Sequence, residues 1–99
     1  KTDIISSGSA EKGKIIYMVQ VSTSSERIEI RPENFKGMKD ITEIFLSDRY
    51  KYAAGSFYDY DEAAQYRKQI ESVFPDAFVI AVRDNKILPL REALKLSNY

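Results

Sequence analysis

The chain has 99 residues, 43% of them hydrophobic and 30% charged, and its 15 Lys and Arg balance its 15 Asp and Glu. This size suits one domain with a modest core, and zero net charge gives no general attraction to nucleic acid or to an acidic membrane. The absence of Cys and His excludes disulfides, the common zinc sites and Cys–His or Ser–His catalytic pairs. No apolar run approaches the length of a membrane span, so we expect no membrane insertion by this chain.

Residues 1–14 contain the run Ser-Ser-Gly-Ser and scattered charges, with almost no apolar pattern. Such a composition is typical of a flexible linker. We therefore expect residues 1–14 to be a linker to something upstream, and residues 15–99 to be the folded domain.

A first strand is predicted over residues 15–21 from its β-branched composition and its period of two. Its two faces would carry different side chains: Tyr17, Val19 and Val21 on one, and Met18, Gln20 and Ser22 on the other. The segment from residue 17 to 23 recurs in degenerate form at residues 50–56, which suggests two copies of one structural unit.

Three further segments complete the predicted sheet. Residues 41–46 and 50–54 are joined by a tight turn at residues 47–48, which predicts a hairpin. Residues 77–82 are a nearly continuous apolar run of strand length. A turn at residues 84–86 then precedes a short strand at 87–88 and a final helix over 89–96.

The clearest helix begins after Asp59 and is expected to run from Tyr60 to Val73. Asp59 as N-cap and Glu62 three residues later fit a capping box. The apolar stripe has helical spacing and comprises Ala63, Tyr66, Ile70, Val73 and Phe74. Pro75 follows and ends the helix.

The crossover from residue 25 to 40 contains Pro32 and Gly37, so no helix there should exceed about two turns. The resulting order predicts an α+β domain of the βαββαβ, ferredoxin/RNP-like type: a four-stranded antiparallel sheet with helices on one face. The other face of such a sheet is bare and available for binding.

Four motifs in this order resemble the SPOR domain, the sporulation-related repeat that binds peptidoglycan. They are residues 17–21 (Tyr-Met-Val-Gln-Val), 50–57 (Tyr-Lys-Tyr-Ala-Ala-Gly-Ser-Phe), 62–64 (Glu-Ala-Ala) and 76–81 (Asp-Ala-Phe-Val-Ile-Ala). The last motif, followed by residues 85–87, looks most like the SPOR domains of Bacteroidetes.

This resemblance implies a non-catalytic module that binds glycan strands stripped of their stem peptides. It implies a place in the periplasm or cell envelope and a role in targeting an attached cell-wall amidase or division protein. The chain departs from the family at residues 22–24, where Gly-Ser-Phe is usual, and at residues 25–40, where the family has its first helix. Because both segments border the family's glycan groove, an alternative remains: a protein–protein adaptor of the same fold that has lost glycan binding.

The resemblance and the period-two pattern together indicate six candidate glycan-binding residues: Gln20, Ser22, Thr23, Arg49, Tyr50 and Lys51. We expect Gln20 to point outward from the bare face and to offer its amide to sugar hydroxyls and N-acetyl groups. Lys51 would lie on the same face and pair with a lactyl carboxylate. The competing interpretation is that both are ordinary solvated residues of a half-exposed sheet. Tyr50 would stack on a sugar ring or join the core.

Other classes of function find less support in the sequence. An RNA-binding module of this fold needs outward aromatic residues and a basic surface, whereas Ala53, Gln20 and Lys51 take those positions here, so we expect no nucleic-acid partner. The carboxylates Asp59 and Asp61 are explained by helix capping. We therefore expect no catalytic residues, no cofactor and no metal.

Overall fold

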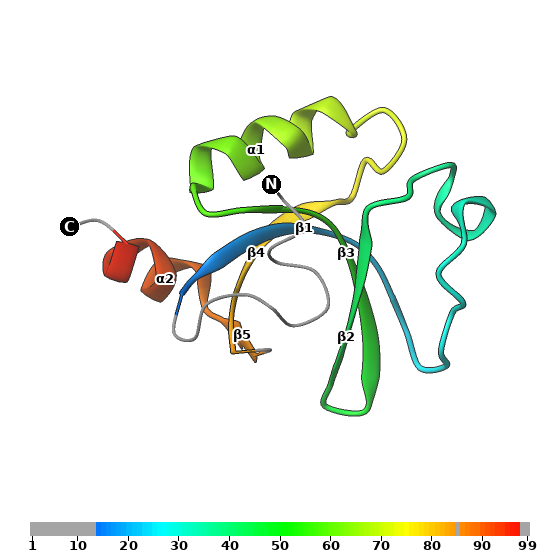
Figure 1. Cartoon of the computed structure of the whole chain (residues 1–99), viewed down its shortest axis with the longest axis horizontal. Coiled ribbons are helices and arrows are strands. Elements are labelled where there is room, and N and C mark those ends of the chain that lie inside the picture. The colour runs from blue at the N-terminus through cyan, green and yellow to red at the C-terminus, as the bar shows by residue number, and fades with distance from the viewer. Residues whose placement is uncertain (1–13, 85, 98–99) are drawn as a thin grey trace.

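The computed structural model describes residues 14–84 and 86–97 (Figure 1). Apart from Lys14, the predicted linker lies outside the described residues. These contain five strands and two helices: β1 (Ile16–Ser24), β2 (Ile41–Leu46), β3 (Arg49–Phe57), α1 (Tyr60–Gln69), β4 (Phe78–Arg83), β5 (Lys86–Leu88) and α2 (Leu90–Ser97). A short 3-10 turn at Pro32–Phe35 lies between β1 and β2.

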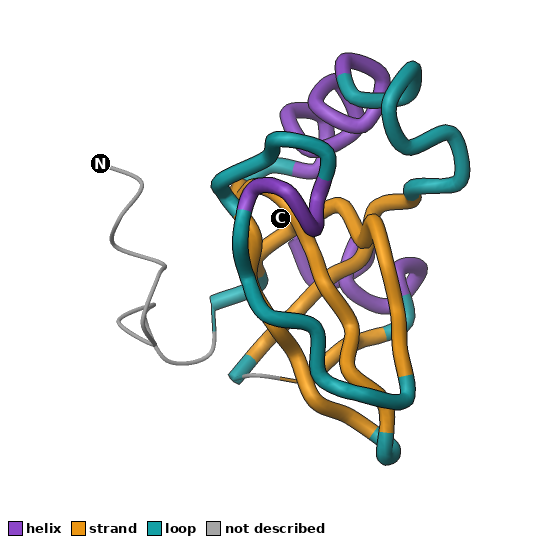
Figure 2. Tube along the Cα trace, turned by 90° about the vertical axis from the view of Figure 1, so that its right-hand side faces the viewer, coloured by secondary structure: helices purple, strands orange, loops and turns teal. Residues whose placement is uncertain are grey.

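All strand pairs are antiparallel, in the order β2-β3-β1-β4-β5. The predicted α+β class with an antiparallel sheet is confirmed. The expected number of four strands is wrong, because the short segment Lys86–Leu88 turns back at Asp84, whose φ is 52°, and pairs with β4 as an edge strand. The sheet curls strongly, as the side view of the strands shows (Figure 2).

Helix α1 lies across one face of the sheet and contacts β1, β3 and β4 (Figure 1). On this face Tyr17 packs with Ala63 and Ala81, so the predicted orientation of Tyr17 toward the helices is confirmed. The Asp59 side chain accepts the amide hydrogen of Asp61 and caps the helix. The helix ends at Gln69 rather than at Val73, because the following residues form turns that fold back on Ile70.

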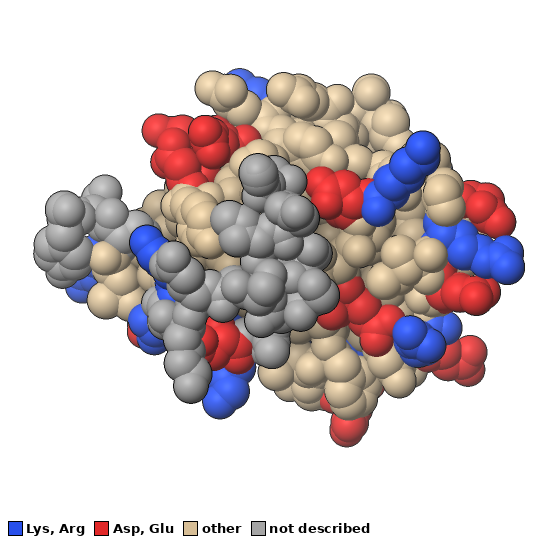
Figure 3. Space-filling model, in the orientation of Figure 1, with Lys and Arg blue, Asp and Glu red and all other residues tan. Residues whose placement is uncertain are grey.

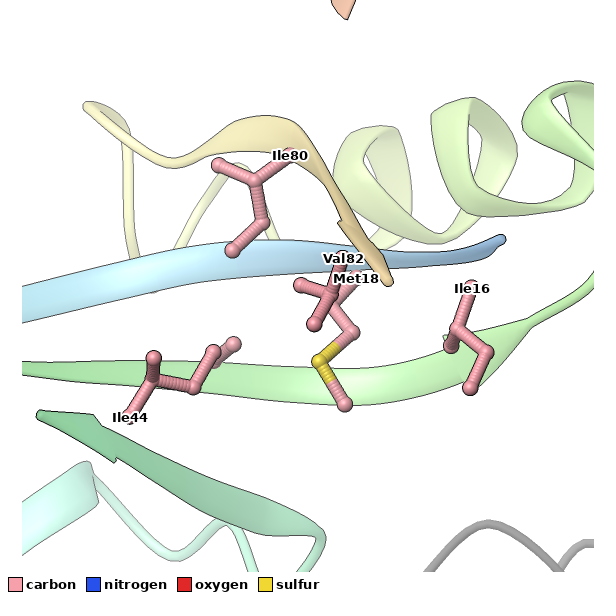
Figure 4. Close-up of a cluster of buried hydrophobic side chains, with 6 residues drawn as sticks. Ile16, Met18, Ile44, Ile80 and Val82 are labelled. Atoms are coloured by element: carbon pink, nitrogen blue, oxygen red, sulfur yellow. The ribbon is translucent and has the colours of Figure 1, made fainter. Parts of the chain in front are cut away.

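The opposite face was expected to be bare and available for binding, and over much of its area this expectation is wrong. It carries an apolar cluster drawn from four strands: Ile16, Met18, Ile44, Ala53, Ile80 and Val82, with Ile87 packed against it. The side chains converge inside the curl of the sheet (Figure 4). Strand β1 is therefore apolar on both faces over its first half, and only its second half is free to present polar groups on this side.

Two bulges interrupt the pairing of β1 with β3. The register shifts between Tyr17 and Val19 and again between Gln20 and Ser22. The first shift lies at Gly55 of β3. Its φ of 76° is a left-handed conformation that glycine adopts without strain. The second places the extra residue in β1, at Val21. These bulges increase the local twist and contribute to the curl.

The first crossover is irregular, as predicted. Its one regular element is the turn at Pro32–Phe35, which inserts the buried Phe35 ring against Tyr52, with 5.2 Å between ring centroids. The Ile28 amide donates to the Tyr52 hydroxyl at 2.7 Å. The Lys36 ammonium donates to the Val73 carbonyl at 3.2 Å and so joins the crossover to the segment after α1.

Candidate functional site

The predicted site residues divide between the two faces of the sheet. Thr23 pairs with Lys51, and Gln20 pairs with Ala53, which belongs to the apolar cluster opposite α1. Directly paired residues share a face, so Gln20, Thr23 and Lys51 all lie on the face without α1. Arg49 joins them, because it precedes Lys51 by two positions in β3.

Gln20 is only 9% exposed, so the expectation that its amide projects freely into solvent is wrong. Its neighbours across the ladders are Ala53 on β3 and Phe78 on β4, and the curl of the sheet brings these strands around it. Gln20 therefore lies at the border between the apolar cluster and the polar residues beyond it.

Beyond Gln20 the same face becomes polar, and we call this part the polar rim: Gln20, Thr23, Thr42, Arg49 and Lys51. The Arg49 Nε donates to the Thr23 Oγ1 at 3.3 Å, which holds the guanidinium beside the hydroxyl. Lys51 is half-buried between Thr23 on β1 and Ile44 on β2. Within residues 14–84 and 86–97 neither cation of the rim forms an ion pair.

Ser22 and Tyr50 do not belong to this rim. The extra residue at Val21 rotates Ser22 onto the helix-bearing face, opposite Tyr52, whereas an unbroken alternation would have kept it beside Gln20. There Ser22 lines a cleft of about 330 Å³ with residues that include Asn34, Lys36 and Asp76. Tyr50 packs on Phe45, with 4.6 Å between ring centroids.

Two residues of this region were not singled out from the sequence. Thr42 pairs with Ala53 and adds a hydroxyl to the polar rim, and Phe45 is 55% exposed beside Tyr50. The signal for both was the two-residue turn between Leu46 and Arg49, which fixes the hairpin register and places Phe45 opposite Tyr50.

Two neighbouring groups on the side of α1, Asp40 and Tyr66, have raised pKa values. Burial raises the pKa of the Asp40 carboxyl, and a hydrogen bond from the Gly55 backbone opposes this rise. Burial also raises the pKa of Tyr66, with a smaller contribution from the Asp40 charge. Tyr66 packs against Phe57 on the side of α1, so these shifts lie away from the rim.

The surface charges fit the neutral composition. Figure 3 shows the molecule from the same side as Figure 1. Over the described part of the surface seen there, basic and acidic side chains are interspersed, without a large area of one sign. Among the described residues no group of three or more acidic side chains is placed to hold a metal ion. No helix in the described part of the chain is long and apolar enough to cross a membrane.

The arrangement of the rim suits recognition of a polar, weakly anionic ligand: two cations, two hydroxyls and one amide lie at one end of a curled sheet. Comparison of the chain with family models, with curated proteins and with solved structures finds no match.

Proposed function

We propose that this chain is a non-catalytic, SPOR-like module that binds the glycan strands of peptidoglycan, in the form stripped of stem peptides. The sequence motifs that carry the resemblance occupy neighbouring strands: residues 17–21 lie in β1 and residues 50–57 in β3, and the two strands pair directly. The third strand motif, residues 76–81, leads into and lies mainly in β4, on the other side of β1. The three strand motifs thus lie in adjacent strands, which supports the proposal.

We also propose that the sheet is a variant of the ferredoxin/RNP-like arrangement. The order β2-β3-β1-β4 is the order that a βαββαβ chain with right-handed crossovers produces. In this interpretation β5 is an addition at the β4 edge, and the irregular segment with Phe35 at its centre replaces the first crossover helix.

One observation carries the functional proposal: Lys51 lies directly opposite Thr23, and Arg49 donates a hydrogen bond to the Thr23 hydroxyl. A stripped glycan strand offers hydroxyls, N-acetyl groups and free lactyl carboxylates. The cations of the rim pair with the carboxylate, and the Thr23 and Gln20 side chains bond the neutral groups. Each such contact contributes about 1 kcal/mol, so we expect a dissociation constant that is micromolar or weaker.

The biological role follows from this ligand. The module would bring an attached amidase or division protein to glycan in the periplasm or cell envelope, and catalysis would belong to that attached protein.

The experiment is a pull-down of the purified chain with sacculi before and after amidase treatment, with circular dichroism to establish that the chain is folded. Retention that increases after stem peptides are removed supports the proposal. A folded chain that is retained on neither preparation contradicts it. That result favours the adaptor alternative, for which the large exposed fraction of Phe45 is the supporting observation.

A further inference from the structure

The outer edge of β4 is covered over only half of its length. Strand β5 pairs with Ala81–Arg83 and ends at Leu88. Pro89 follows, and because proline has no amide hydrogen it cannot continue the ladder. In the described part of the chain, the β4 segment Phe78–Ile80 therefore has a strand neighbour on the β1 side alone.

The register of β4 against β5 indicates which backbone groups of β4 point toward the uncovered edge. Arg83 pairs with Lys86 at the closed end of the β4–β5 hairpin, and because the pair that closes a short hairpin is usually hydrogen-bonded, we infer that these two residues exchange backbone bonds. Every second residue of β4 points its N–H and C=O groups toward the same side, so Ala81 also faces β5. Val79 is the next in this series, and its N–H and C=O are directed at the uncovered edge.

A cavity of about 590 Å³ lies along this edge. Its lining includes Ile80 and Ile87, which belong to the face opposite α1. It also includes Leu88 and Leu90, which belong to the helix-bearing face. Since Tyr60, Ala64 and Arg67 of α1 also line it, the cavity lies beside the β4 edge on the helix-bearing side, where a side chain of an additional strand would enter.

The residues that line the cavity indicate which chemical groups a ligand there would carry. The lining is mostly apolar, and Phe78, which also lines the cavity, is 51% exposed. Arg67 on α1 is the one charged residue among the lining residues that the structure describes. Its nearest carboxylate, that of Glu71, is 3.8 Å away at the longer end of ion-pair distances. A carboxylate on the occupant would give Arg67 a closer partner.

We propose that an extended peptide segment of another protein adds to the sheet at the β4 edge. Its backbone bonds the Val79 N–H and C=O, a large apolar side chain fills the cavity, and an acidic side chain pairs with Arg67. This is β-strand addition, in which backbone bonds supply affinity and alternate side chains supply specificity. The proposal does not depend on glycan binding: its contacts lie on β4 and α1, whereas the polar rim lies on β1, β2 and β3 and borders the β4 edge only where Gln20 pairs with Phe78.

The test uses the whole chain labelled with ¹⁵N and a positional library of N-acetylated, C-amidated hexapeptides. Members with a large apolar residue and an acidic residue should shift the Val79 amide resonance and slow its hydrogen exchange. Methylation of the peptide nitrogen that faces Val79 removes one backbone bond and should weaken binding about tenfold. Arg67→Gln should weaken only the acidic peptides, several-fold, whereas Lys68→Gln on the same helix should leave binding unchanged.

Three results would overturn the proposal. The first is a library that leaves the Val79 resonance unmoved at millimolar concentration. The second is an N-methylated peptide that binds as well as its parent, which would mean that the ligand does not add as a strand. The third is a Val79 resonance that moves with protein concentration alone, which would make a second copy of this chain the occupant.

Discussion

Gly55→Ala should destabilise the domain more than a glycine replacement in a similar backbone conformation elsewhere. Gly55 has a φ of 76°, and a Cβ placed there would lie 2.7 Å from the Phe57 Cε2 and 3.0 Å from the Tyr66 Cε2. The two rings pack on each other, with 5.4 Å between their centroids, so neither can move away independently.

Gly37→Ala is the matched control, because Gly37 has a φ of 90° and a Cβ there would meet no atom within 4 Å. Both substitutions incur the left-handed backbone cost of about 1–2 kcal/mol. Only Gly55→Ala adds the cost of overpacking, about 1–3 kcal/mol. The difference between the two variants should therefore be about 1–3 kcal/mol in the free energy of unfolding.

Urea denaturation followed by circular dichroism measures this difference, provided the slope of free energy against urea is the same in both variants. In thermal melts each kcal/mol corresponds to about 4–8 °C for a domain of this size. If Gly55→Ala costs no more than Gly37→Ala, the bulge is not packed under the two rings and the account of this region is wrong.

Three smaller predictions concern single contacts. Asp59→Ala removes the N-cap of α1 and should cost about 1 kcal/mol in urea denaturation, with a loss below a few tenths meaning that the cap contributes little. Tyr52→Phe leaves the Ile28 amide without its acceptor and should cost about 1–3 kcal/mol, whereas an unchanged midpoint would contradict the bond. The pKa of the Asp40 carboxyl is higher in the folded state than in the unfolded state. The free energy of unfolding should therefore fall as pH rises from the ordinary pKa of this group through the raised one. Asp40→Asn should remove that decline, and identical pH profiles of wild type and variant would refute it.

Much of the fold follows from local patterns in the sequence. The alternation in residues 15–21, the two-residue turn at Ser47 and Asp48 and the cap at Asp59 each fix an element and its direction. Gly55 also carried a local signal, since glycine inside a strand pattern often marks a bulge. The predicted bounds of β2, residues 41–46, agree with the structure.

The errors arise from features without a local signal. Val21 is a good strand residue, and nothing near it in the sequence indicates the bulge that moves Ser22 to the other face. The burial of Gln20 depends on how far the sheet curls, which is set jointly by strands distant in the sequence. The short strand at residues 87–88 was predicted, but three residues are too few for a period-two pattern, so its place in the sheet depends on pairing with β4.

A charge-matched pair of double variants tests most directly whether the cations of the polar rim bind glycan, as we propose. Arg49→Gln with Lys51→Gln removes both rim cations, whereas Lys68→Gln with Lys95→Gln removes two exposed lysines from α1 and α2. Circular dichroism establishes that both double variants remain folded, and the rim variant needs this control because Lys51 is half-buried.

The measurement is retention on amidase-treated sacculi at fixed salt concentration. We predict that the rim variant loses retention several-fold and that the control variant is retained like the wild type. Equal retention of the rim variant and the wild type would contradict the account, and so would an equal loss in both variants, which would reduce the interaction to net charge.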